Sequence, residues 1–136
     1  MAAKFQGSCL CGSIRYQGSA EPVMAGNCHC RDCQKSTGGA MASILAAPAG
    51  TIKITGKPKY FAVKGESGKN VHRGFCPDCG SPLFSKVDAM PDMLFVKAGT
   101  LDDPAMFKPA FDIYTSSAQP WDHMNPALAK FPKMPG

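Results

Sequence analysis

Hydrophobic and polar residues alternate along much of this chain in short runs bounded by glycine and proline. Alternation with a period of two in segments rich in β-branched and aromatic residues is typical of β-strands. Eight segments show this pattern, at 13–18, 40–47, 51–56, 59–64, 71–76, 82–87, 92–99 and 111–116. Side chains on one face of these strands are expected to be buried, for example Ile14, Tyr16, Ile44, Phe84 and Phe95.

Helix is predicted only as a turn or two around residues 32–36. Glycine and proline make up 26 of the 136 residues, which divides the chain into short elements and argues against long helices. The expected class is therefore all-β. A chain of this length fits one domain, and we expect a core over about 5–122 and an extended, proline-containing tail over 123–136.

Charge and hydropathy exclude two classes of partner. The formal net charge is +5, but the basic residues are scattered and are not interleaved with an aromatic platform, so nucleic acid is not expected as a partner. The longest nearly apolar run, "AMASILAAP" (40–48), is too short to span a bilayer, and the first residues lack the apolar core of a secretion signal. We expect a soluble, cytoplasmic protein with no membrane contact.

Seven cysteines occur in three clusters, at 9 and 11, at 28, 30 and 33, and at 76 and 79. Disulfides are rare in a reducing compartment, and an odd number of cysteines cannot pair completely. Zinc takes four thiolates in a closed site and three when one position stays open to substrate. The clusters therefore predict metal ligation, and disulfides or inert core thiols are the alternative.

The first and last clusters together supply four ligands. Cys76 and Cys79 form a CxxC turn followed by Gly80, which suits the left-handed position of a zinc knuckle. In an extended segment Cys9 and Cys11 point to the same face. We expect these four cysteines to form a structural zinc site.

The middle cluster, Cys28, Cys30 and Cys33, can hold a metal by itself and has no obvious fourth ligand. His29 should point away from its two cysteine neighbours, because side chains alternate along extended backbone. His72 and His123 have no spaced partner histidine and are interpreted as surface or hydrogen-bonded side chains. The triad therefore looks open, whereas closure by water or another side chain would make it structural.

Three basic residues lie within a few positions of a cysteine in the sequence, namely Arg31, Lys35 and Arg73. They could offset thiolate charge or hold a substrate carboxylate. Basic side chains at such positions are more commonly solvated surface cations with neither role.

The sequence resembles the family of glutathione-dependent formaldehyde-activating enzymes, which also includes centromere protein V. The motifs that carry the resemblance are "GSCLCGSIRY" (7–16), "CHCRDCQKSTG" (28–38), "RGFCPDCGSPLF" (73–84), "GTLDDPA" (99–105) and "SSAQPW" (116–121). The resemblance implies a single-domain β-tent of short antiparallel strands with zinc knuckles. It also implies a structural zinc on Cys9, Cys11, Cys76 and Cys79 and a catalytic zinc on Cys28, Cys30 and Cys33.

Active members of this family condense glutathione with formaldehyde to S-(hydroxymethyl)glutathione, a carbon–sulfur lyase reaction. The resemblance thus implies a small thiol and a small aldehyde as partners. Three thiolates already outweigh the charge of one zinc ion, so we expect the metal of the triad to be labile. The competing prediction is a non-enzymatic, zinc-stabilised binding module, but the chain has no basic tail for chromatin or microtubules.

Overall fold

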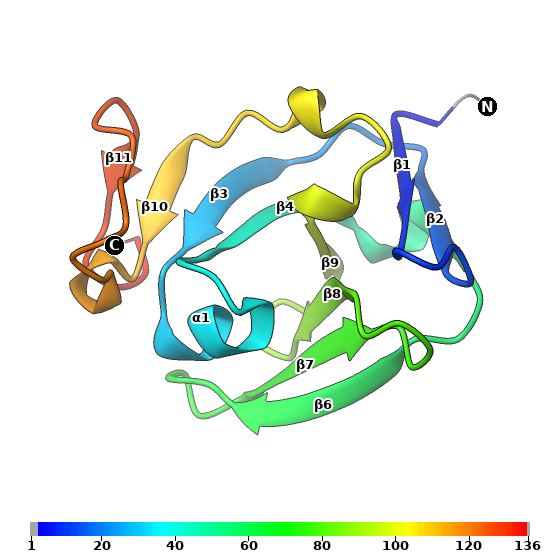
Figure 1. Cartoon of the computed structure of the whole chain (residues 1–136), viewed down its shortest axis with the longest axis horizontal. Coiled ribbons are helices and arrows are strands. Elements are labelled where there is room, and N and C mark those ends of the chain that lie inside the picture. The colour runs from blue at the N-terminus through cyan, green and yellow to red at the C-terminus, as the bar shows by residue number, and fades with distance from the viewer. Residues whose placement is uncertain (1–2, 136) are drawn as a thin grey trace.

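Two β-sheets form the framework of the computed structural model, which describes residues 3–135 (Figure 1). The smaller sheet has the order β1 (Phe5–Ser8), β2 (Arg15–Gly18) and β5 (Ile52–Thr55). The larger sheet has the order β11 (Ala129–Lys130), β10 (Phe111–Ile113), β3 (Met24–Cys28), β4 (Ala42–Pro48), β9 (Met93–Lys97), β8 (Pro82–Val87), β7 (Asn70–Phe75) and β6 (Lys59–Lys64). The prediction of an all-β protein is confirmed. Pairing is antiparallel except that β10 runs parallel to both β3 and β11.

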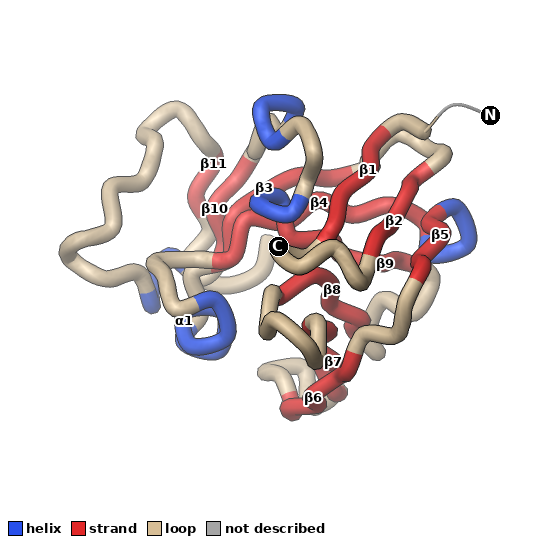
Figure 2. Tube along the Cα trace, turned by 45° about the vertical axis from the view of Figure 1, so that its right-hand side comes forward, coloured by secondary structure: helices blue, strands red, loops and turns tan. Residues whose placement is uncertain are grey.

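One short α-helix, α1 (Arg31–Thr37), follows β3 and is labelled in Figure 2, where helical segments are blue. It ends at Gly38, whose left-handed conformation (φ 74°) lets its N–H donate to the carbonyl of Gln34 at 2.8 Å. Single turns of 3₁₀ helix occupy η1 (Ala49–Thr51), η2 (Ala98–Thr100), η3 (Pro104–Met106) and η4 (Thr115–Ser117). Helix is thus a minor component, as predicted.

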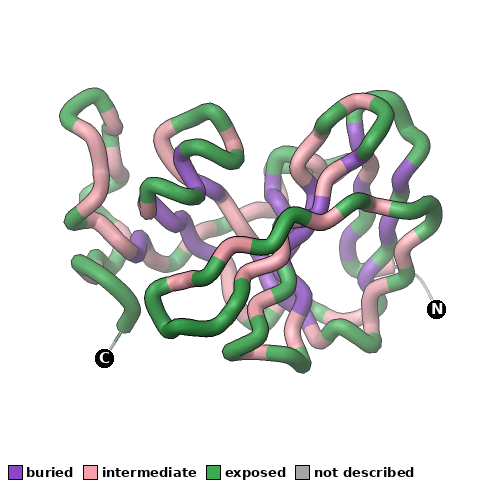
Figure 3. Tube along the Cα trace, turned by 90° about the horizontal axis from the view of Figure 1, so that it is seen from below, coloured by how far each residue is buried: buried purple, intermediate pink, exposed green. Residues whose placement is uncertain are grey.

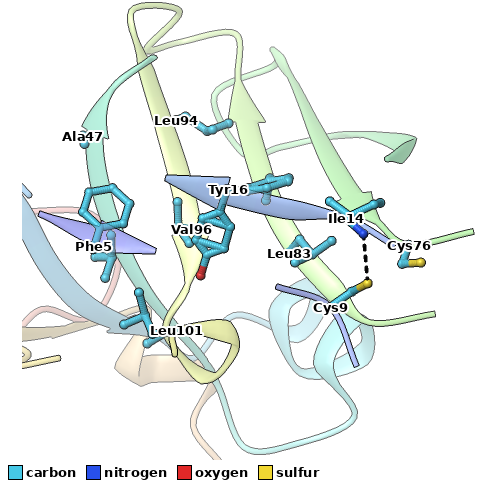
Figure 4. Packing of buried hydrophobic residues seen from close by; sticks show 13 residues of the cluster. Phe5, Cys9, Ile14, Tyr16, Ala47, Cys76, Leu83, Leu94, Val96 and Leu101 are labelled. Carbon is cyan, nitrogen blue, oxygen red and sulfur yellow. Dashed lines mark hydrogen bonds between the residues drawn. The ribbon is translucent and has the colours of Figure 1, made fainter. Parts of the chain in front are cut away.

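The main core lies between the small sheet and one face of the large sheet (Figure 4). Tyr16 of β2 packs edge-on against Phe84 of β8, with ring centroids 5.4 Å apart, and its hydroxyl lies 2.7 Å from that of Thr100. Ile14 and Phe95 are also buried, whereas Ile44 is half-buried. Buried or half-buried positions alternate with exposed ones along β2 and β5, whereas β4, β8 and β9 carry runs of consecutive buried residues. Figure 3 colours the buried parts of the chain purple.

The opposite face of the large sheet carries polar side chains. Register places Lys97 opposite Ile44, and Ser85 opposite both Phe95 and Arg73. Because directly paired residues share a face, as do residues two apart on one strand, Lys97, Ser85 and Arg73 lie on one side of the sheet. Cys28 faces the same side through the pairing of β3 with β4. The helix α1 packs against β4.

The segment 123–136, expected as an extended tail, contributes β11 to the edge of the large sheet beside β10 (Figure 1). It also accepts hydrogen bonds from the backbone that follows β10. The N–H of Tyr114 donates to the carbonyl of Lys133, and that of Thr115 to the carbonyl of Phe131, both at 3.1 Å. Within residues 3–135, no helix is long and apolar enough to cross a membrane.

Candidate metal centres

The structure brings together the cysteines of the first and last clusters. The Sγ atoms of Cys9, Cys11, Cys76 and Cys79 all lie within 4.8 Å of one another. Two tight turns position them, because Gly12 and Gly80 both adopt left-handed backbone conformations, with φ of 81° and 79°. Four thiols at this spacing could hold one metal ion, and an all-thiol set suits zinc.

Backbone N–H groups point at the sulfurs of this cluster. Ile14 N–H donates to Cys9 Sγ at 3.3 Å, and Asp78 N–H donates to Cys76 Sγ at 3.4 Å. Cys9 and Cys76 are buried in the main core, and Figure 4 shows the contact between Ile14 and Cys9. The cluster therefore joins the turn after β1 to the turn after β7, as a structural site would.

The second cluster lies at the end of β3 and the start of α1. The Sγ atoms of Cys28, Cys30 and Cys33 lie within 4.8 Å of one another. Cys30 is the N-cap of α1, and its sulfur accepts a hydrogen bond from the N–H of Cys33 at 3.3 Å. One strand end and one helical turn thus bring the three thiols together, without any distant cysteine.

Cys33 is the most acidic of the three thiols. Hydrogen bonds from the thiols of Cys28 and Cys30, together with the charge of Lys97 and a hydrogen bond from Arg73, lower the pKa of Cys33 to about 2 against the effect of burial. The same contacts with Cys30 and Cys33, together with burial, raise the pKa of Cys28. The triad is therefore an electrostatically coupled unit of sulfurs beside two cations.

The basic residues named from the sequence have different positions. Arg73 reaches the triad, with its Nη2 donating to Cys33 Sγ at 3.8 Å. Arg31 is exposed and donates to the side chain of Gln34, and Lys35 is exposed on α1. Lys97, which the sequence analysis did not name, is buried at 7% exposure, and burial lowers its pKa. The sequence signal that could have identified Lys97 is its position within a largely hydrophobic predicted strand.

Buried polar residues of the described chain lie around the triad, on the face of its sulfurs and on the opposite face. They are Asn27, His29, Gln34, Ser85, Lys97 and Asp112. Burial of polar groups is unfavourable unless they are hydrogen-bonded, so a concentration of them indicates a constrained polar centre instead of ordinary packing.

His29 is fully buried and points to the side opposite the sulfurs. Its Nε2 lies 2.8 Å from Asp112 Oδ1, and its Nδ1 lies 2.6 Å from Asp122 Oδ2. Asp112 also accepts hydrogen bonds from Asn27 and Lys130. These hydrogen bonds fix the backbone between Cys28 and Cys30 from the face opposite the sulfurs.

The segment after β10 is fixed against the triad by two further residues. Gln34 donates from Nε2 to the carbonyls of His29 at 2.7 Å and Ser117 at 3.0 Å. Tyr114 adopts a left-handed conformation (φ 56°), uncommon for a non-glycine residue, and packs against the triad cluster. Burial raises the pKa of its phenol to about 12.

The other two histidines, His72 and His123, are not members of either cysteine cluster. His72 pairs with Asp88 at 3.0 Å, at the border of a groove of 580 Å³ that also includes Tyr60 and Met93. None of the residues lining this groove is a cysteine. His123 is not a member of either group of potential metal ligands in the described chain.

Comparison with solved structures supports the fold. A protein from Rhodobacter sphaeroides, a structural-genomics target, superposes with a TM-score of 0.59 at 15% sequence identity, covering 93% of this chain and 98% of that one. No curated protein matches the sequence. A family profile described as glutathione-dependent formaldehyde-activating enzyme matches residues 4–117, which include all seven cysteines. The chain therefore belongs to the glutathione-dependent formaldehyde-activating enzyme family.

Proposed function

We propose that this protein is a zinc-dependent carbon–sulfur lyase that condenses a thiol, glutathione or a similar molecule, with formaldehyde or another small aldehyde. Family membership supports the reaction class. The observation that carries the proposal is the group of three cysteines, because zinc takes four ligands and three from the chain leave one for a substrate thiol.

The two cysteine clusters have separate roles in this proposal. Cys9, Cys11, Cys76 and Cys79 would hold a structural zinc, and Cys28, Cys30 and Cys33 would hold a catalytic one. When bound at the triad, zinc would keep a substrate thiol in its nucleophilic thiolate form.

The chain's own residues prepare the site for this chemistry. The N-cap contact of Cys30 and the hydrogen bonds of His29 fix the geometry of the three sulfurs. Lys97 and Arg73 bring positive charge beside sulfurs that would otherwise repel an incoming thiolate. The reducing cytoplasm that we expect for this protein would keep all seven cysteines out of disulfides and available as metal ligands.

The test is the rate of hemithioacetal formation from glutathione and isotope-labelled formaldehyde, followed by exchange NMR against the uncatalysed reaction. The wild type is expected to accelerate exchange, and Cys30→Ser is expected to lose this acceleration. Lys35→Ser, an exposed change on the same helix, serves as the control and should remain active. A wild type no faster than Cys30→Ser would favour the alternative function, a non-enzymatic zinc-stabilised binding module.

A further inference from the structure

Two cations beside the triad lack carboxylate partners. Lys97 is buried, and its Nζ donates to Ser85 Oγ at 3.0 Å. Among the residues described, neither Lys97 nor Arg73 takes part in an ion pair with an acidic side chain. Buried lysines are rare without an anionic partner, so this pair of cations calls for a specific explanation.

Both side chains also have unused hydrogen-bond donors. Arg73 Nε is the single buried side-chain nitrogen or oxygen atom of residues 3–135 without a hydrogen-bond partner. An ammonium group has three donors, and the structure gives Lys97 one acceptor, Ser85. Buried donors without acceptors are costly, and they mark a place where an oxygen acceptor from outside the chain would be favourable.

These donors lie next to the sulfurs. Arg73 Nη2 is 3.8 Å from Cys33 Sγ, and Lys97 interacts electrostatically with all three thiols of the triad. The register of β7, β8 and β9 places Arg73, Ser85 and Lys97 on one face, so Ser85 lies between the two cations and orients the amine.

We propose that Arg73 and Lys97 form an oxyanion site that binds the carbonyl oxygen of the aldehyde substrate. This inference rests on the proposed function. The thiolate sulfur forms a bond to the carbonyl carbon, the π electrons of the C=O bond move to oxygen, and the resulting alkoxide takes a proton from water. The proton lost when the thiol ionises has already passed to solvent, so the overall reaction is a simple addition. Preorganised donors aimed at the developing alkoxide would stabilise the transition state.

The burial of Lys97 favours this oxygen over a distant carboxylate of the thiol. Lys97 is almost inaccessible to solvent, and Arg73 is within reach of the Cys33 sulfur. An oxygen one carbon away from the attacking sulfur would stay beside the triad and its cations, whereas a distant acidic group would have to enter beside a buried amine. In a simpler role, both cations would only offset thiolate charge. Their removal would then weaken the binding of thiols with and without such an oxygen equally.

Two probes separate these roles in the cobalt-loaded protein. Ethanethiol offers sulfur alone, and thioacetate offers sulfur with an oxygen on the same carbon, as in the hemithioacetal alkoxide. Binding of each is measured by the sulfur-to-cobalt charge-transfer absorption. Lys97→Met and Arg73→Gln are expected to weaken thioacetate binding ~10-fold or more relative to ethanethiol binding, because each removes a charged donor to the oxygen that only thioacetate carries.

Lys86→Met is the matched control, since it removes an exposed lysine from the same sheet on the opposite face. It should bind both probes as the wild type does. Equal weakening of both probes in the two variants, or no weakening in either, would refute the oxyanion site while leaving the proposed function standing. A wild type that binds neither probe would refute the proposed function and the oxyanion site together. Arg73→Gln, at a half-buried position, remains informative if Lys97→Met fails to fold.

Discussion

His29 is flanked by two proposed ligands in the sequence, yet both of its ring nitrogens contact carboxylates. Alternation along extended backbone predicts its direction, because neighbours at 28 and 30 point to the other side. Its partners Asp112 and Asp122 are 83 and 93 positions away, and no local pattern identifies them. The orientation of a residue is thus readable from sequence, but its long-range hydrogen bonds are not.

Replacing His29 by leucine should destabilise the protein strongly. The substitution leaves two buried carboxylates without their shared partner, and breaking a buried pair from one side costs ~3 kcal/mol or more. Urea unfolding at neutral pH measures the change. His72→Leu is the control, because it removes a partly exposed pair with Asp88 and should cost ~1 kcal/mol or less. Equal losses in the two variants would contradict the importance of the buried network.

The buried phenol of Tyr16 should make the stability of the protein depend on pH. Burial raises the pKa of its phenol to about 12, above the value of about 10 expected in the unfolded chain. The unfolded state therefore releases this proton first, and the wild type loses stability as pH rises from about 10 to about 12. Below pH 10, Tyr16→Phe should cost ~1 kcal/mol through the lost contact with Thr100. Urea unfolding of both proteins should show the difference shrinking above pH 10, and a constant difference would contradict this account.

The helix α1 is the element that assembles the triad. The sequence predicts a short helix here. The spacing of the three cysteines lets one N-cap residue and one helical turn bring their sulfurs together. Strand prediction is less complete. The eight predicted segments do not include β1, β3 or β11. Of these, β3 contains Gly26, an unfavourable strand residue, but a side chain there would collide with the ring of Phe111 on β10. Tertiary packing thus overrides local propensity at this position.

Cys30→Ser should separate metal binding from helix formation. Serine is a preferred N-cap residue, so the hydroxyl can replace the sulfur as acceptor for the N–H of Cys33. The variant should lose metal from the triad, falling toward one zinc per chain in elemental analysis, and keep a wild-type circular dichroism spectrum. Cys76→Ser, in the other cluster, should lower thermal stability markedly. Full metal content in Cys30→Ser would show that the triad does not hold a metal.

At the scale of the whole molecule, cysteine spacing indicates which distant segments meet. The pairing of 9 and 11 with 76 and 79 correctly places the turn after β1 beside the turn after β7. It does not reveal how the large sheet curves to bring β7 and β9 toward the triad. Lys97 was missed for this reason, because only the register of three strands places it near the cysteines. Metal clusters are local or paired patterns, whereas the polar lining of a site depends on the complete topology.

We propose that the molecule has one closed and one open thiol site for metal. Cadmium-113 NMR of the cadmium-loaded protein distinguishes the two, because the chemical shift depends on the number of sulfur ligands. Two signals of equal area are expected, one from each cysteine cluster. Glutathione should move the triad signal, which Cys30→Ser abolishes, and leave the other in place. A single signal, or two signals that both ignore glutathione, would show that the triad is not an open metal site.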